Sequence, residues 1–568
     1  MTDRIEAIKD FQWQKKHHAY RQAAPDGLER TWRDPSVTDA MRTALRLQCA
    51  LAAEKPVLLP QELIAFTRTV PNLPSQFSDE EWAEICAHHT IHERGNVSNL
   101  SPDYGYVMKT GLLAIREWLS DCDEHTAMRI SIDAVLDLTT RYAKLARDLG
   151  DVSLAETLYH VPAYPARTFR EALQSLRILH FAMWAEGNYH NTLGRFDQYM
   201  MPYLTHDLDA GIETEESAFE LLEAFFLSCN RDSDLYPGMQ QGDNGQSMVL
   251  GGMTPDGKDG YNKLSVMCLK ASAELRLIDP KINLRVSSST PLSVFELGTR
   301  LTRLGLGFPQ YENDDVAIPA LTAMGYEECD ARDYAMAACW EFIIPGKGME
   351  IPNIDAMPFA NNVDWVIRNK LCECADMDEL KSCVKSAIFD SVDQILAKKK
   401  NLYIIPSPFL SLFFEGCVEN ARDISLGCKY NNWGLHGTGL APAADMLAAV
   451  EQVIFTENVP AKELIDALNA DFVGYDALRS RLLDAPKMGN DNDCADNYAV
   501  WLLDVFAEAV KGKKNERGGI IRAGTGTAMY YVSHAASLGA TADGREAGVP
   551  LPANYAPSLN VRLNGPGR

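Results

Sequence analysis

The 568-residue sequence lacks any long apolar run. No segment approaches the roughly 18 uninterrupted apolar residues that a membrane helix needs, and the start, MTDRIEAIKDFQWQKKHHAY, has neither an apolar core nor a small-residue cleavage site. We therefore expect no membrane helix and no signal peptide. Basic residues are also scarce, 54 against 78 acidic ones, for a net charge of −24. An acidic surface repels nucleic acid and anionic lipid, so we expect neither as a partner.

Cysteine pairs at a metal-binding spacing are absent as well. The 13 cysteines are dispersed, and the nearest approach, Cys372 with Cys374, is too tight for a CxxC site. Dispersed cysteines without an export signal indicate reduced thiols, and hence a cytoplasmic protein. Glu186 with His190 has no third and fourth ligands at a supporting spacing, so the sequence predicts no metal site.

No Ser-, Gly- or Pro-rich linker and no fixed-period repeat divides the chain. In the first 230 residues, apolar positions recur at three- and four-residue steps, which predicts helices at 37–55, 106–119, 127–149 and 169–185. The first part of the chain is therefore expected to be mainly helical.

From about residue 238 the pattern changes. Short β-prone runs at 247–251, 282–287, 335–344, 403–406 and 409–414 alternate with helical patterns at 261–275, 292–304 and 377–398. A final helical block covers 442–456, 461–470 and 493–510, and the segment 540–568 looks irregular. Strands that alternate with helices of this length favour an α/β sheet or barrel.

The apolar run at 335–344 carries a cysteine and, two residues later, a glutamate: Cys339 and Glu341. If the segment is extended, both side chains point to one face and Trp340 points away. A carboxylate opposes thiolate formation, and no histidine lies close in sequence to activate the thiol. The pair therefore suits a thiol that exchanges hydrogen atoms while the carboxyl moves protons. On these residues alone, a buried structural cysteine beside a salt-bridged glutamate is the simpler interpretation.

Six further motifs occur in a fixed order, and each is weak by itself. They are GRFDQ at 194–198, GQSMVLGG at 245–252, DPKINLRV at 279–286, PQYEND at 309–314, CDARDY at 329–334 and ATADGREAG at 540–548. As an ordered set, they resemble the glycyl radical enzymes of the pyruvate formate-lyase type over nearly the whole chain.

This resemblance implies an α/β fold: a ten-stranded barrel of two antiparallel five-strand halves, surrounded by helices, with the cysteine loop inside. We expect one catalytic domain over 1–568, with a mainly helical part at 1–235 and the rest of the barrel at 236–568. In relatives such as glycerol dehydratase the loop reads Gly-Cys-Val-Glu, where Cys carries a thiyl radical and Glu is the general base. The match here is Ala338-Cys339-Trp340-Glu341, which implies those roles for Cys339 and Glu341.

A second segment, Gly-Cys-Val-Glu at 416–419, copies that family tetrapeptide letter for letter. The surrounding sequence resembles a later, structural stretch of the family, so we prefer Cys339 to Cys417 as the radical-bearing residue.

The glycine that stores the radical in this family lies in an Arg-Val-Ser/Ala-Gly-Tyr motif, which these 568 residues do not contain. Arg562-Leu563-Asn564-Gly565 is similar only superficially, because Pro566 replaces the aromatic residue. Either the sequence is a fragment or the enzyme is split, and we favour a split enzyme. Its partners would be a small glycyl radical subunit and a radical S-adenosylmethionine activating enzyme; a homodimer stays open.

Four residues are candidates for substrate binding. Asp197 aligns with a family carboxylate that often contacts substrate, although a salt bridge to Arg195 is an equal alternative. Glu186 and His190 would share one face if helical, in a segment where relatives contact substrate. His436 lies in what looks like a glycine-rich loop.

The reaction favoured is a radical elimination, in which a dehydratase or lyase cleaves a C–O or other C–X bond of a small molecule. Acyl transfer is less favoured, because relatives with that activity carry two adjacent cysteines and Ala338 fills the first place here. Decarboxylation and a non-catalytic paralogue remain alternatives.

Overall fold

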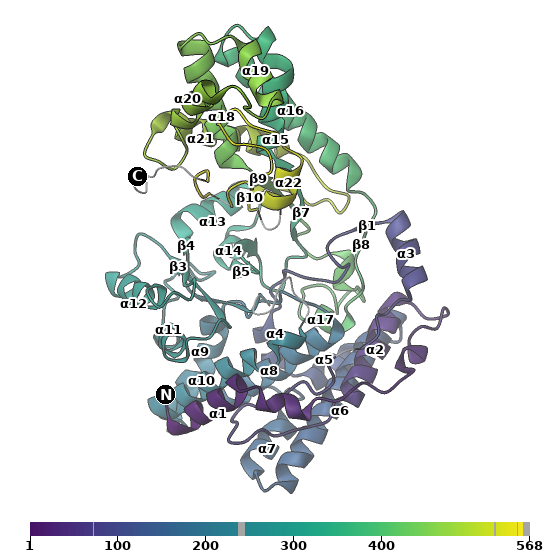
Figure 1. Cartoon of the computed structure of the whole chain (residues 1–568). Helices are drawn as coiled ribbons and strands as arrows, with labels where there is room; N and C mark the ends of the chain where they lie inside the picture. Colours follow the sequence, from purple (N-terminus) through teal and green to yellow (C-terminus); the bar gives the residue numbers. More distant parts are fainter. Residues whose placement is uncertain (72, 237–244, 528–529, 554, 560–568) are drawn as a thin grey trace. The chain divides into compact units, whose positions relative to one another are not determined.

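The computed structural model describes residues 1–71, 73–236, 245–527, 530–553 and 555–559 (Figure 1). They form two compact units, each made of segments that are separate in sequence. The first unit comprises Met1–Glu350 and Leu402–Asn431, and the second comprises Ile351–Asn401 and Asn432–Arg568. None of the helices in the described part of the chain is both long and apolar enough to cross a membrane.

Helices make up most of the first unit. They are α1 (Asp3–Trp13), α2 (Asp39–Ala53), α3 (Asp79–His88), α4 (Tyr104–Thr110), α5 (Leu112–Trp118), α6 (Asp123–Asp148), α7 (Val152–His160), α8 (Phe169–Glu186), α9 (Phe196–Ala210), α10 (Glu215–Asn230), α11 (Lys263–Leu275), α12 (Leu292–Thr302), α13 (Asp314–Ala323), α14 (Glu328–Arg332) and α17 (Pro408–Ser411), with short 3₁₀ turns η1 (Lys16–Tyr20), η2 (Leu28–Thr31), η3 (Ser233–Leu235) and η5 (Ile424–Leu426).

Side-chain caps explain where several of these helices begin. Thr38 accepts a hydrogen bond from Met41 N at the start of α2, and Thr168 accepts one from Glu171 N at the start of α8. The helices predicted at 37–55, 127–149 and 169–185 are confirmed as α2, α6 and α8. The one predicted at 106–119 is broken into α4 and α5 by Gly111, whose φ of 80° is left-handed and where a Cβ would meet Ala163 O at 2.7 Å.

The strands of the first unit are short. A parallel sheet contains β2 (Ser247–Gly251), β3 (Lys281–Val286) and β4 (Gln310–Asn313), in that order. β1 (Thr90–Ile91) pairs with β8 (Leu402–Tyr403), and β5 (Ala335–Ala337) forms an antiparallel hairpin with β6 (Glu341–Ile343).

The second unit is built on another parallel sheet of three strands. Its strands are β7 (Ile351–Pro358), β9 (Trp433–Thr438) and β10 (Ile521–Thr525), with β9 in the centre. The helices are α15 (Phe359–Lys370), η4 (Leu371–Glu373), α16 (Met377–Lys398), α18 (Leu440–Val450), the π-helix η6 (Glu451–Thr456), α19 (Ala461–Asn469), α20 (Asp476–Asp484), α21 (Asp493–Val510) and α22 (Tyr530–Ala536). In Figure 1, α15, α16, α18 and α21 lie beside this sheet.

Two predicted strands have a different structure. The segment predicted as a strand at 409–414 contains the helix α17, and the single strand predicted at 335–344 is the β5–β6 hairpin. The expected α/β class is confirmed, while the described strands form four sheets of two or three strands each. The ten-stranded barrel therefore stays a prediction.

An apolar core holds the base of the hairpin. Val249 of β2, Leu321 of α13, and Ala335 and Met336 of β5 belong to one buried cluster. Beside it, the buried Arg285 of β3 pairs with Asp314 at 2.8 Å, lies over the Tyr334 ring at 3.8 Å, and donates to the carbonyls of Arg332 and Tyr334. The arginine thus fastens the segment that leads into β5.

Candidate active site

Cys339 lies at the tip of the β5–β6 hairpin. Ala337 pairs with Glu341, so the loop consists of Ala338, Cys339 and Trp340. Ala338 has a left-handed backbone with φ of 46°, a conformation that non-glycine residues adopt rarely. Because the chain turns back here, Cys339 and Glu341 do not share one face of an extended strand, contrary to the expectation from the sequence.

The Glu341 side chain instead folds back over the loop. Its Oε2 accepts hydrogen bonds from the backbone N–H groups of Cys339, at 2.7 Å, and Trp340, at 2.8 Å. Among the described residues, the second oxygen, Oε1, has no hydrogen-bond partner. One carboxylate oxygen therefore fixes the loop while the other is available for proton transfer.

Two side chains from the parallel sheet hold the strained residue of the loop. The Ala338 carbonyl accepts hydrogen bonds from Lys281 Nζ of β3, at 2.5 Å, and from Ser247 Oγ of β2, at 3.1 Å. A left-handed alanine costs about 1–2 kcal/mol, and a hydrogen bond from a charged donor offsets a similar amount. The sheet therefore determines the conformation that presents the thiol.

A third contact comes from β4. With its amide oriented to satisfy its neighbours, Gln310 donates to Cys339 O, at 2.8 Å, and to Asn283 Oδ1, at 2.7 Å, and accepts from Trp340 Nε1 at 3.2 Å. One amide thus holds both Cys339 and Trp340.

Glu312 completes the polar face below the loop. In the register of the sheet, Lys281, Asn283 and Arg285 alternate along β3, and Gln310 and Glu312 lie beside them on β4. Glu312 is 2% exposed, and neither of its carboxyl oxygens has a hydrogen-bond partner in the described part of the chain. Burial raises the pKa of this carboxyl well above its ordinary value, which favours its neutral form.

The sequence interpretation missed these four residues, namely Lys281, Asn283, Gln310 and Glu312. A signal for part of the set is present, because Lys, Asn and Arg alternate with Ile, Leu and Val in KINLRV. A strand with that pattern has one polar face. Gln310 and Glu312 gave no such signal, since β4 spans only Gln310–Asn313.

Cys339 itself is exposed, and the neighbouring Trp340 side chain is 52% exposed. The resemblance predicts a loop enclosed within a barrel. The structure instead places the thiol at the exposed tip of the β5–β6 hairpin. The thiol is therefore open to approach from one side and held by polar groups on the other.

Comparison with known proteins identifies the fold family. The family model "Pyruvate formate lyase-like" matches residues 75–534, most of the sequence. The chain belongs to the pyruvate formate lyase-like family. This membership confirms the resemblance predicted from the six ordered motifs, and the matched region includes the Cys339 hairpin and its supporting sheet.

Two curated relatives illustrate the range of the family. The trans-4-hydroxy-L-proline dehydratase of Clostridioides difficile is 26% identical over 509 residues, covering 79% of this chain and 63% of the relative. The isethionate sulfite-lyase of Desulfovibrio desulfuricans is 27% identical over 527 residues, covering 82% of this chain and 63% of the relative. The chain thus spans less than two thirds of the length of these relatives.

A solved structure shows the same fold. The glycerol-bound, B12-independent glycerol dehydratase from Clostridium butyricum superimposes with a TM-score of 0.84 at 24% identity, over all of this chain and 85% of that one. The likeness establishes the fold of the family for this chain.

Glu186 and His190 do not share a helical face, contrary to prediction. Glu186 is the last residue of α8, which ends at Gly187 with a left-handed φ of 117°. The Glu186 carboxylate accepts hydrogen bonds from the backbone N–H groups of Phe409 and Leu410, at 2.7 and 3.1 Å, at the start of α17. Burial raises the pKa of Glu186 to about 8. This residue therefore caps α17, which explains why 409–414 is not a strand.

His190 lies beyond that glycine and is 6% exposed. Its Nδ1 is 3.0 Å from Asn99 Oδ1, whereas its Nε2 has no hydrogen-bond partner among the described residues. Asn99 therefore orients the His190 ring through Nδ1, and Nε2 is available to bind a ligand.

Asp197 lies in the first turn of α9 and is fully buried. Its carboxylate accepts hydrogen bonds from Gly251 N, at 2.7 Å, and Ser265 Oγ, at 2.5 Å. Arg195, the predicted alternative partner, pairs with Asp333 instead, at 3.0 Å. Burial raises the pKa of Asp197 despite these bonds. The carboxylate therefore joins α9 to β2 and α11.

His436 lies on the central strand β9 of the second unit, opposite Gly524 of β10 and Ala356 of β7, and not in the predicted glycine-rich loop. Its glycine neighbours pack closely against other strands: a Cβ on Gly434 would meet Pro352 O at 2.0 Å. Gly565 lies outside the described residues.

Cys417, the alternative radical-bearing residue, is 1% exposed. It lies in a turn where its N–H donates to Phe414 O, and the next residue, Val418, accepts a hydrogen bond from His125 at 2.8 Å. Burial raises the pKa of the Cys417 thiol. Its neighbourhood is therefore that of a structural cysteine.

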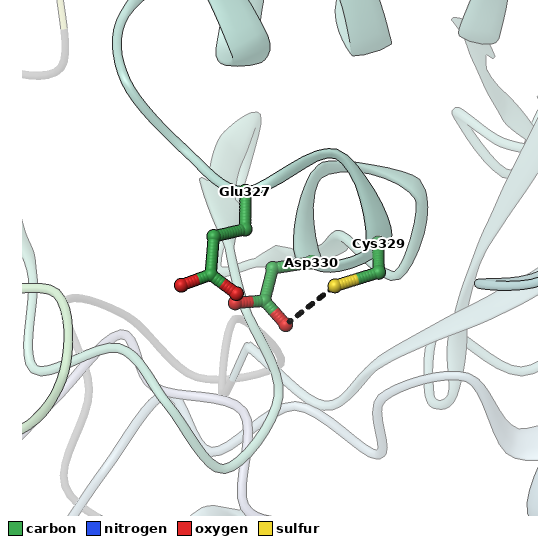
Figure 2. Close-up of side chains that lie close together, drawn as sticks. All are labelled: Glu327, Cys329 and Asp330. Atoms are coloured by element: carbon green, nitrogen blue, oxygen red, sulfur yellow. Dashed lines mark hydrogen bonds between the residues drawn. The ribbon is translucent and has the colours of Figure 1, made fainter.

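One group of side chains has a composition that could suit a metal ion: Glu327, Cys329 and Asp330 (Figure 2). Lys429 pairs with Glu327 at 2.8 Å and with Asp330 at 2.7 Å, and Lys347 pairs with Asp330 at 2.5 Å. Although burial opposes it, hydrogen bonds from these lysines hold the pKa of Asp330 below its ordinary value. Because two ammonium groups already balance the carboxylates, we assign no metal to this group.

Proposed function

We propose that this chain is the large catalytic body of a glycyl radical enzyme that eliminates a group from a small molecule, as a dehydratase or lyase. Cys339 is the hydrogen-atom donor and acceptor, and Glu341 is the general base. One observation carries the proposal: the two carboxylate oxygens of Glu341 have different surroundings. Oε2 accepts the hydrogen bonds that fix the cysteine loop, while Oε1 has no partner among the described residues. Family membership supplies the reaction class.

The chemistry follows from these two side chains. Cys339 gives its thiol hydrogen to a radical stored elsewhere and becomes a thiyl. The thiyl takes a hydrogen atom from a substrate C–H bond, and Glu341 removes the proton of the adjacent hydroxyl. The neighbouring C–X bond then breaks, and X leaves with its electron pair; where X is hydroxyl, the proton held on Glu341 converts it to water. The product radical takes a hydrogen atom back from Cys339, and the thiyl that remains recovers a hydrogen atom from the glycine, which regenerates the stored radical. Where X is not hydroxyl, Glu341 passes its proton to X or to solvent.

The radical source would be a glycyl radical domain beyond these 568 residues, because the Arg-Val-x-Gly-Tyr motif does not occur in them. We favour a small separate subunit, on which a radical S-adenosylmethionine activating enzyme would install the glycyl radical. The exposed position of Cys339 supports this arrangement, since a glycyl loop must come into contact with the thiol. A crystal structure of the complex would also test the ten-stranded barrel and any homodimer.

For the substrate, we propose a small molecule with a hydroxyl group next to a second leaving group. The relatives named above act on a hydroxylated amino acid and on a hydroxysulfonate, as their names state. Of the predicted binding residues, we retain His190, which has one open ring nitrogen in the described structure. His436 lies on β9 of the second unit, and its role in binding stays a prediction. We propose that Asp197 and Glu186 position the surrounding helices, since their carboxylates already bind protein groups. The 13 cysteines, all free, support a cytoplasmic setting.

The test is an anaerobic reconstitution of this chain with an activated glycyl radical protein and a panel of polyols, amines and sulfonates. We expect one class to be consumed by the wild type and by Cys417→Ala, and none by Cys339→Ala. The glycyl radical signal should persist in all three mixtures. Turnover by Cys339→Ala, or its loss only in Cys417→Ala, would overturn the assignment.

A further inference from the structure

The first unit contains a cavity whose residues play no part in the chemistry above. It has a volume of 510 Å³ and forms where four helices end. Trp13 and Asn230 are the last residues of α1 and α10, and Arg276 and Gly305 lie just beyond the ends of α11 and α12. A cavity of this size is within the range of about 300–1,000 Å³ that small-molecule sites occupy.

The walls of the cavity are largely apolar. Leu227 is buried and Leu306 is half-buried, whereas Ile278 is 50% exposed and Trp13 is 76% exposed. A tryptophan this exposed at the edge of a concave apolar surface loses contact with water when a ligand with an apolar body enters.

Positive charge gathers in the same cavity, although the protein as a whole carries a net charge of −24. Lys9, Lys15 and Arg276 line it, and none of the three forms an ion pair within the described residues. The acid of the lining, Asp234, is already bound by Arg21 through two hydrogen bonds of 2.7 and 2.9 Å. The three cations are therefore not balanced by a side chain.

Part of this charge is balanced by the helices themselves. Each helix C-terminus carries about half a negative charge, so the helix ends offset part of the positive charge of the three cations. The cations that no acidic side chain of the described residues pairs with favour an anionic ligand.

His17 provides an independent sign that a ligand belongs here. It lines the cavity and is only 5% exposed, and neither of its ring nitrogens has a hydrogen-bond partner among the described residues. Burial, with the nearby charges of His18 and Arg231, lowers the pKa of His17 to about 4. The imidazole is thus neutral at pH 7 and has one N–H to donate to a bound anion. Buried polar atoms without partners are rare in folded proteins.

We propose that this cavity binds an organic monocarboxylate with an apolar body. The carboxylate lies against Lys15, Arg276 and the His17 N–H, and the apolar body lies against Trp13, Leu227 and Ile278. The site is independent of the radical chemistry, so its failure leaves the proposed function unaffected.

Isothermal titration with octanoate tests the proposal, with octanamide and acetate as matched ligands that lack the charge or the apolar body. We expect one octanoate per chain, with a dissociation constant below about 1 mM. Octanamide should bind at least about tenfold more weakly, because a charged hydrogen bond of this kind is worth about one decade in affinity. Acetate should also bind at least about tenfold more weakly, because it has no apolar chain to bury.

Variants locate the site. Arg276→Gln and Lys15→Gln each should weaken octanoate binding about tenfold, while Lys258→Gln, an exposed lysine paired with Asp256 outside the cavity, should leave it unchanged. All three positions are exposed, so we expect each variant to fold, and circular dichroism would check this. Equal binding of octanoate and octanamide, no saturable binding at about 10 mM, or wild-type affinity in the Lys15→Gln Arg276→Gln double variant would each overturn the proposal.

Discussion

Two Cys-x-Glu segments of the first unit, those at Cys339 and Cys417, lie in opposite environments. Around Cys339, the chain turns through a left-handed alanine, the thiol is exposed, and side chains from three strands hold the loop. Around Cys417, which carries the letters of the family tetrapeptide, the thiol is buried in a turn. The letters alone therefore do not identify the radical-bearing residue; the surrounding geometry does.

The buried carboxyl groups near the two cysteines differ in their hydrogen bonding. Asp423, close in sequence to Cys417, accepts hydrogen bonds from Ser407 N, Ser411 Oγ and Ser425 N. Glu312, on the sheet that supports the Cys339 loop, has no hydrogen-bond partner among the described residues. Unsatisfied polar groups and backbone strain concentrate at functional sites, so the comparison favours the Cys339 loop.

The largest expected effect is a difference in kcat between variants of Glu341 and of Glu419. Glu341→Gln keeps an oxygen to accept the loop N–H bonds but cannot take a proton, so we expect kcat to fall by about 10²–10⁴-fold. Glu419→Gln, the matched change at the exposed glutamate of the second segment, should leave kcat unchanged. Steady-state kinetics of the reconstituted enzyme measures both, and equal losses would remove the distinction between the segments.

Part of this contrast could be predicted from sequence and part could not. The order of the motifs identified Cys339 over Cys417, and periodicity placed β2, α16 and α21 at their observed bounds. The hairpin was missed because Ala338 turns the chain without a glycine, asparagine or proline to mark the turn. The helix α17 was missed because Phe-Leu-Ser-Leu-Phe-Phe has the composition of a strand, and its cap, Glu186, lies more than 200 residues away in sequence.

Chemical labelling gives the next largest contrast. At pH 8, iodoacetamide should modify the exposed Cys339 within the folded protein, whereas Cys417 is buried and its raised pKa keeps it protonated. If local opening at Cys417 requires about 3 kcal/mol, its modification is slower by about a hundredfold. Peptide mass spectrometry against time measures the two rates, and comparable rates would contradict the difference in burial.

A smaller effect on kcat is expected from Lys281, which holds the loop through Ala338 O. Lys281→Met removes the charged hydrogen bond to Ala338 O, worth about 1.5–3 kcal/mol, and we expect kcat to fall by about tenfold or more as the thiol loses its position. Lys258→Met, at an exposed lysine outside this sheet, is the control. An unchanged kcat for Lys281→Met would show that the sheet does not hold the loop.

The smallest effect concerns stability and pH. The folded pKa of Glu312 is raised by burial, so the folded protein keeps a proton that the unfolded chain loses above about pH 4.3. Wild-type stability therefore falls as pH rises toward the folded pKa, and Glu312→Gln escapes this loss. In chemical denaturation, we expect the variant to gain stability over wild type as pH rises above about 4.3. Glu419→Gln should show no such trend. If the free energy of unfolding of Glu312→Gln depends on pH in the same way as that of the wild type, a raised pKa for Glu312 is contradicted.

The most direct test follows the hydrogen atom itself and needs no substrate. Thiol hydrogens exchange with water, so a thiol that passes its hydrogen reversibly to a glycyl radical replaces the glycine hydrogen with deuterium in D₂O. Electron paramagnetic resonance of an activated glycyl radical protein, mixed with this chain in D₂O, reports that exchange as loss of the hydrogen splitting. We predict loss of the splitting with the wild type and with Cys417→Ala, and its retention with Cys339→Ala. Retention with Cys417→Ala and loss with Cys339→Ala would contradict the account.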